Sequence, residues 1–339
     1  MAKLGMPTVV VKFIEAGIEA IQRSQRGIVA LILEDTKQVI DKLATKTNGH
    51  EVLPNPFLVY TVDDIPEELS DKNKDYILKA LKGYNKPPLK VVVYMMQQGG
   101  DKAGADRFQE PLKAMLTERF DYLAIPTIET AQLEYVATWV KTARENKFKK
   151  IKVVLPGSNA DYEGVINFGN TKVVTADREY KAAEYTARIA GLVAGTNMTQ
   201  SATYAPLTEV IDCDRHTQDE MDTMVNEGKF FIWYDGEKFK MSRAMNSLVT
   251  TSQGKLEGYQ TIKIVDIMDM IYDDIRKTAQ DSYIGKYTND YENKCLLISA
   301  ILGYFKQLEN ERLLQKDYST CEIDCEAVRT YQLSHGLFT

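Results

Sequence analysis

Histidine and cysteine are scarce in this sequence, with 3 histidines and 4 cysteines among 339 residues. A Ser-His-Asp or Cys-His catalytic arrangement needs a histidine, and none of these histidines stands in a supporting local motif. The cysteines lack the paired C-x-x-C spacing of a zinc site, and so few in a chain of this length do not indicate a disulfide framework. We therefore expect no catalytic residues and no metal ligands.

The sequence also lacks the features of membrane and nucleic-acid-binding proteins. No apolar run is long enough to span a bilayer, and the N-terminal residues do not have the layout of a signal peptide. The net charge is −6, whereas phosphate backbones are bound by concentrated lysine and arginine. We expect a protein that is made in a cytoplasm, with no membrane insertion and no nucleic acid as its partner.

One glycine-containing loop comes close to a phosphate-binding motif. Gly99 and Gly104 have the spacing of a Walker A loop, after an expected strand. However, Ala105 stands where the motif requires lysine, and Asp106 stands where serine or threonine would hold magnesium. We expect no cofactor here. An α/β enzyme or small-molecule-binding protein with an unrecognised site stays open as the alternative function.

Strand and helix patterns alternate after Gly27. The near-continuous apolar run at 28–33 is typical of a strand buried on both faces. Similar runs alternate with helical patterns, and a β-α-β-α order predicts an α/β fold with a mostly parallel sheet and flanking helices. The expected strands are 28–33, 57–62, 89–95, 122–125, 151–155 and 165–174, and the expected helices are 72–83, 105–119, 131–146 and 180–193.

After Pro206 the pattern changes to an α+β C-terminal part. Asp235-Gly236 is a favoured two-residue turn of a β-hairpin, and helical patterns precede and follow it. The expected hairpin strands are 230–234 and 238–241, and the expected helices include 217–226 and 295–314. We therefore divide the chain into an N-terminal arm at 1–20, an α/β domain at 21–203 and an α+β domain at 204–339.

The clearest helical pattern lies upstream of Gly285. Six apolar residues at three- and four-residue steps predict one face turned toward a core: Ile264, Ile267, Met268, Ile271, Ile275 and Ala279. Acids occupy the opposite face and its flank: Asp266, Asp269, Asp273 and Asp274. Acids spaced along a helix do not make the tight loop of a calcium site, so this pattern predicts a solvated or partner-facing surface.

A strand pattern also stands at the N-terminus. Val9, Val11 and Phe13 alternate along it, and Gly17 follows. The whole segment is Thr8, Val9, Val10, Val11, Lys12, Phe13 and Ile14. A terminal strand needs a sheet to join, so it either pairs with another subunit or forms an edge strand of its own domain.

Several segments, taken in order, resemble one protein family. They are 27–36, 80–84, 90–94, 191–196, 204–207, 246–255 (NSLVTTSQGK), 262–275 (IKIVDIMDMIYDDI) and 283–287 (YIGKY). Together they are similar to contractile phage-tail sheath proteins, especially the short kind found in clostridial myophages, defective prophages and R-type bacteriocins. The order and joint presence of the segments carry the resemblance, because no single segment is specific.

The resemblance implies a structural protein rather than an enzyme. Such subunits stack as hexameric rings around a tail tube, on a baseplate, within a virion tail or bacteriocin particle. Their terminal arms pair with strands of neighbouring subunits, the α/β domain faces outward, and the C-terminal part faces the tube and this mesh of arms. Contraction releases energy stored in the extended assembly and drives the tube through a bacterial envelope, with no nucleotide consumed.

One feature departs from the family pattern. Short sheath proteins continue past their last helix into a C-terminal arm that ends in a strand, whereas this chain ends at Thr339. The sequence does not show whether a C-terminal arm follows Thr339, or whether this chain alone can close the mesh of arms. A non-contractile structural protein of a similar particle is a further alternative, and the sequence does not separate phage from bacteriocin.

Overall fold

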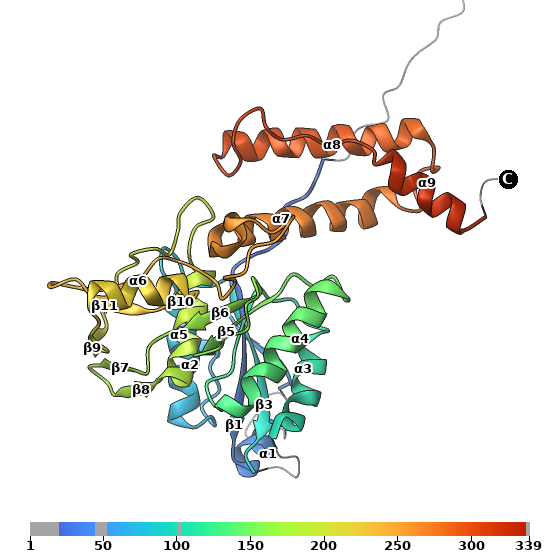
Figure 1. The fold of residues 1–339 in the computed structure, drawn as a ribbon. Helices are drawn as coiled ribbons and strands as arrows, with labels where there is room; N and C mark the ends of the chain where they lie inside the picture. The colour runs from blue at the N-terminus through green and yellow to red at the C-terminus, as the bar shows by residue number, and fades with distance from the viewer. Residues whose placement is uncertain (1–19, 45–52, 100–103, 337–339) are drawn as a thin grey trace, which may run out of the picture. The chain divides into compact units, whose positions relative to one another are not determined.

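A computed structural model describes residues 20–44, 53–99 and 104–336 of the chain (Figure 1). The chain forms two compact units: a larger one, Ser24–Ile271, and a smaller one that joins Met1–Arg23 with Tyr272–Thr339. The larger unit extends past the expected boundary between residues 203 and 204, because the chain after it adds a strand, β10 (Lys229–Phe230), to the edge of the large sheet.

The larger unit is built on a seven-stranded, mostly parallel sheet, which confirms the expected fold class (Figure 1). The strand order is β10-β6-β5-β4-β1-β3-β2; β2 is antiparallel to β3, and the other neighbouring strands are parallel. The bounds are β1 Ile28–Asp35, β2 Phe57–Val59, β3 Lys90–Gln97, β4 Tyr122–Ala124, β5 Lys152–Pro156 and β6 Val165–Phe168.

Helices cover both faces of this sheet, so β1 is buried on both sides as its apolar run predicts (Figure 1). Val29, Leu31 and Leu33 face the core under α2 and α5, whereas Ile28 and its alternate neighbours face α3 and α4. The helices are α1 Lys37–Leu43, α2 Asp71–Leu81, α3 Gln109–Met115, α4 Leu133–Glu145 and α5 Ala182–Ala194. Short 3-10 turns, η1 Val62–Asp64, η2 Gly104–Phe108 and η3 Thr130–Gln132, lie in this part of the chain.

The packing of α5 against α2 depends on one glycine. A Cβ atom added to Gly191 would lie 2.0 Å from the backbone oxygen of Ala80. We expect Gly191→Ala to lower the free energy of unfolding by at least about 1–3 kcal/mol, because the two helix backbones must separate. Gly303 is the matched control, since nothing lies within 4 Å of its added Cβ. Gly303→Ala should instead be neutral or stabilising by up to about 1 kcal/mol when unfolding is followed by circular dichroism.

The expected strand 165–174 is wrong, because the chain leaves the large sheet between β6 and β7 (Lys172–Thr175). Asn170 stands at this turn, and its amide is bonded to both the N–H and the carbonyl of Ile232. β7 then pairs with β8 (Glu179–Lys181) and β9 (Val210–Cys213) in a separate antiparallel sheet. A strand pattern in the sequence could not show this break, since it depends on a residue about sixty positions away.

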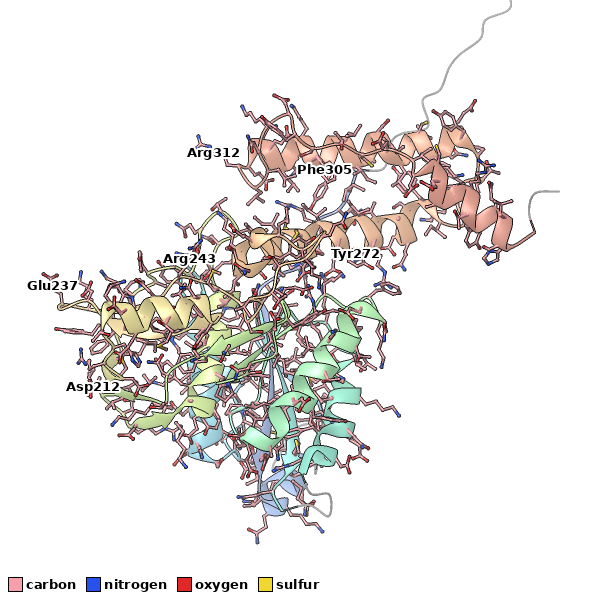
Figure 2. The ribbon with its side chains drawn as sticks, viewed as in Figure 1. Asp212, Glu237, Arg243, Tyr272, Phe305 and Arg312 are labelled. Atoms are coloured by element: carbon pink, nitrogen blue, oxygen red, sulfur yellow. The ribbon has the colours of Figure 1, made fainter. Side chains whose placement is uncertain are left out.

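The expected hairpin and the helix before it are confirmed. β11 (Ile232–Tyr234) pairs antiparallel with β12 (Phe239–Met241), and Glu237 projects from the turn between them (Figure 2). α6 (Gln218–Asn226) begins after Thr217, whose hydroxyl accepts a hydrogen bond from the backbone N–H of Glu220. The 3-10 turn η4 (Glu257–Gln260) then leads into α7 (Ile262–Thr278), inside which the division between the two units falls.

The described part of the smaller unit is helical. The second half of α7 continues into a π-helical turn, η5 (Ala279–Tyr283), and the expected stop follows at Gly285, where φ is 78°. α8 (Tyr291–Asn310) and α9 (Cys325–Ser334) complete it (Figure 1). Among the residues described in both units, no helix is long and apolar enough to cross a membrane.

Candidate functional site

The first half of α7 lies against the edge of the large sheet at which the parallel strands begin. Lys152 is the first residue of β5, Tyr122 is the first residue of β4, and Arg144 lies in the last turn of α4. Two acids of α7 are bonded to these side chains. We call this group of seven residues the edge cluster: Arg26, Asp121, Tyr122, Arg144, Lys152, Asp266 and Asp269.

Asp269 is the buried centre of the edge cluster, with 3% of its surface exposed. Both nitrogens of the Arg144 fork donate to its carboxylate at 2.9 Å, and Nζ of Lys152 donates to Oδ2 at 2.6 Å. Arg144 and Lys152 are buried as well. Fork-to-carboxylate pairs are among the strongest hydrogen-bonded ion pairs, so the side chain of Asp269 has one well-defined position.

Asp266 lies one helical turn earlier and contacts the same lysine. Nζ of Lys152 lies 2.9 Å from its carboxylate, and the hydroxyl of Tyr122 donates to that carboxylate at 2.5 Å. The Lys152 ammonium also lies 5.2 Å from the centre of the Tyr122 ring. Lys152 is thus held between two carboxylates and an aromatic face, which compensates the cost of burying its charge.

Arg26 connects α7 with the start of β1. Its Nη2 donates to the backbone carbonyl of Asp269 at 2.6 Å, and its Nη1 donates to Asp121 at 2.9 Å. Asp121 in turn accepts the backbone N–H groups of Gly27 and Ile28 at 2.7 and 2.9 Å. The edge cluster therefore balances the cations Arg26, Arg144 and Lys152 against the carboxylates Asp121, Asp266 and Asp269.

The pKa shifts show which charged forms the edge cluster stabilises. Burial alone would raise the pKa of Asp269, but the positive charges of Lys152 and Arg144 outweigh it and lower that pKa. Burial would lower the pKa of Lys152, but Asp269 and Asp266 outweigh it and raise that pKa. For Asp266, burial dominates and raises the pKa in spite of Lys152. The core of the cluster is thus an ionised Asp269 with its two cations.

The acids of α7 do not form the solvated surface that their spacing predicts, and a surface facing a partner stays a prediction for Asp266 and Asp273. Asp269 and Asp274 are buried, and Asp266 and Asp273 are half-buried. Within the smaller unit, Asp274 accepts a hydrogen bond from the Tyr304 hydroxyl at 2.6 Å. These acids are buried because other strands and helices supply their hydrogen-bonding partners. The periodicity of α7 gives no information about those partners.

The apolar face predicted for the same helix is only partly confirmed. Ile267 is buried, whereas Ile264 is 41% exposed and Met268, Ile271 and Ile275 are half-buried. In the first half of α7, the buried positions instead include Ile262, Val265 and Met270 together with Asp269. In the sequence, Lys152 is the signal that could have suggested a buried acid on this helix, because a lysine inside the apolar run 151–155 needs a buried anion.

Within the smaller unit, residues next to the N-terminal segment are bonded to α7 and α8. The N–H of Gln22 donates to the Thr278 hydroxyl at 3.0 Å, Arg23 forms an ion pair with Glu311, and the Arg23 guanidinium lies 5.8 Å from the Tyr304 ring centre. The predicted arm strand, Thr8 to Ile14, lies outside the described residues. Where the structure describes the chain, no three side chains suited to a metal ion come together.

A second buried ion pair of the larger unit gives a prediction on pH dependence. Arg188 donates to Glu209 at 2.6 Å; burial would raise the pKa of Glu209, but Arg188 outweighs it and lowers that pKa to about 2. The folded-state pKa lies below the unfolded value near 4.3, so the stabilisation is present above that pH and is lost as the pH falls toward 2.

We expect Glu209→Gln to lose up to about 3 kcal/mol at pH 7, and to differ less from the wild type as the pH falls from 4.5 to 2.5. The measurement is urea unfolding across this pH range. A difference between the two proteins that stays constant from pH 7 to 2.5 would contradict the assignment.

Comparison with known proteins shows which family the chain belongs to. Two family models match it: the phage tail sheath protein central domain over residues 101–247, and the phage tail sheath C-terminal domain over residues 255–337. A tail sheath protein of Clostridium phage phiCD119 is 33% identical over 332 residues, which cover 96% of this chain and 86% of that protein.

Solved structures share the fold. A sheath tail protein from Desulfitobacterium hafniense is 19% identical with a TM-score of 0.71, covering 90% of this chain and 89% of that one. The contracted helical sheath of the anti-feeding prophage is 14% identical with a TM-score of 0.66, covering 91% of this chain and 84% of that one.

The matched proteins are structural components of contractile tails and related injection particles. This chain belongs to the phage tail sheath protein family. It is accordingly a structural protein and not an enzyme, and the predicted resemblance is confirmed.

Proposed function

We propose that this chain polymerises as stacked hexameric rings around a tail tube, on a baseplate, and that contraction of the stack drives the tube through a bacterial envelope. The observation that carries the proposal is the match to a phage tail sheath protein along nearly the full length of both chains. The fold shared with a sheath solved in its contracted state supports it. Edge-cluster side chains are bonded to one another, which suits a mechanical rather than a catalytic role.

The proposal extends to the two ends of the subunit. The N-terminal segment 1–20, with its strand pattern from Thr8 to Ile14, adds to a sheet of a neighbouring subunit. Gln22 and Arg23 lie just after it and contact α7 and α8 of the smaller unit, so tension on the arm acts first on these helices. In the assembled sheath, the α/β domain faces outward and the C-terminal part faces the tube.

The test is co-expression of the chain with the tube and baseplate proteins of its particle, followed by electron microscopy. The expected result is a tube surrounded by a striated sheath, which shortens and widens when the particle is triggered. A chain that stays monomeric beside bare tubes would contradict the proposal.

A further inference from the structure

The chain passes between its two compact units twice, once at Arg23–Ser24 and once inside α7 at Ile271–Tyr272. In each unit, the residues next to these two crossing points are joined by a hydrogen bond. In the larger unit, Arg26 donates to the backbone carbonyl of Asp269 at 2.6 Å. In the smaller unit, the N–H of Gln22 donates to Thr278 at 3.0 Å. Gln22 in the smaller unit and Arg26 in the larger unit are therefore each bonded to α7.

Within the larger unit, Arg26 and Asp269 are bonded in turn to side chains at the starts of the central strands. Asp269 is held by Arg144 of α4 and Lys152 of β5, and Arg26 is held by Asp121, which caps the first N–H groups of β1. A pull on α7 is thus distributed over three neighbouring strands, β1, β4 and β5, rather than over one loop.

Charged side chains fix the position of α7 on the sheet better than an apolar contact would. An apolar stripe can slide by one helical turn and still bury similar area, because the hydrophobic effect is not directional. A shift of α7 by one turn would separate Asp269 from Arg144 and leave buried charges unpaired, which costs several kcal/mol per charge. The edge cluster therefore fixes one position of α7 on the sheet.

We infer that the edge cluster is the anchor that holds α7 on the α/β domain, so that α7 and the backbone at 23–28 together carry tension from the N-terminal arm into that domain. This inference rests on the proposed sheath function. It assigns Asp266, Asp269, Lys152 and Arg26 as positioning residues, which keep the α/β domain attached to α7 while the arm is held by a neighbouring subunit.

The test uses a charge-neutral double variant of the full chain, Asp266→Asn with Lys152→Met, which leaves the Arg144–Asp269 pair in place. Hydrogen exchange with mass spectrometry reports α7 separately from β1 and β3. We expect exchange in peptides from Ile262–Ile271 to rise at least about tenfold, with less than about threefold change in β1 and β3, because local opening needs less free energy than global unfolding. Asp281→Asn is the matched control, an exposed acid of the same helical segment, and should change neither region.

If exchange in β1 and β3 rises as much as in α7, the cluster is a general part of the core and the inference is overturned. Unchanged exchange in α7 would overturn it as well. Arg26→Lys, which keeps the charge but loses the fork, should show a smaller change of the same kind, and it replaces the double variant if that protein does not fold.

The same variants are then examined in particles. We expect sheaths to assemble, since the arm is intact, but averaged images should show the α/β domains less well ordered than in the wild type. Domains as well ordered as in the wild type would contradict the inference. If the wild-type chain forms no sheath, the proposed function fails instead, and the exchange result still stands by itself.

Discussion

Asp269→Ala is expected to lower the free energy of unfolding of the larger unit by about 3–5 kcal/mol. The substitution leaves Arg144 and Lys152 buried without the carboxylate that both of them bond. Most of the loss therefore comes from the buried Arg144 guanidinium, which loses its carboxylate partner, and from Lys152, which keeps only Asp266. It exceeds the typical cost of a single substitution, which is about 1 kcal/mol.

Tryptophan fluorescence is well suited to this measurement, because the sequence has 2 tryptophans and both Trp139 and Trp233 belong to the larger unit. Urea unfolding followed by this signal reports that unit directly. Asp281→Ala is the matched control and should change the unfolding free energy by less than about 0.5 kcal/mol, as exposed substitutions usually do. A loss below about 1 kcal/mol for Asp269→Ala would contradict the arrangement of the edge cluster.

Deletion of residues 1–16 is expected to abolish sheath assembly while the subunit stays folded. Under the proposal, this arm provides the backbone hydrogen bonds to a neighbouring subunit, and Val9, Val11 and Phe13 fix the register of the added strand. Val11→Pro should have the same effect, because it removes one N–H donor and places proline inside a ladder. Val11→Thr is the matched control, since it keeps both the donor and a high strand propensity.

Two measurements separate the possible outcomes for the arm. Thermal unfolding of the purified subunit should be unchanged by the deletion, and electron microscopy after co-expression should show bare tubes. Normal sheaths from the deleted protein would refute the arm proposal. Loss of the subunit fold would show instead that Thr8 to Ile14 form an edge strand of their own domain.

The sequence predicts the parts of the fold that depend on local pattern. The apolar run at 28–33 became the doubly buried β1, and Asp235-Gly236 became the turn between β11 and β12. Both outcomes follow from neighbouring residues alone: a run without polar positions must be covered on both faces, and a turn dipeptide brings its flanking strands together.

The edge cluster could not be predicted in this way. Arg144 and Lys152 are more than a hundred residues from Asp269 along the chain. A helical pattern that places acids opposite apolar residues is normally a solvated surface, and here that expectation failed because the sheet edge supplies cations. The extension of the larger unit past residue 203 could not be predicted for a related reason, since β10 returns to the large sheet only after a separate antiparallel sheet and two helices.

Cryo-electron microscopy of particles purified after co-expression with tube and baseplate tests the central claim most directly. The account predicts this chain in stacked six-fold rings around the tube, with residues 8–14 forming a strand in the sheet of an adjacent subunit. Rings of this chain without contact to a tube, or a tube whose surrounding layer contains no copy of it, would contradict the account.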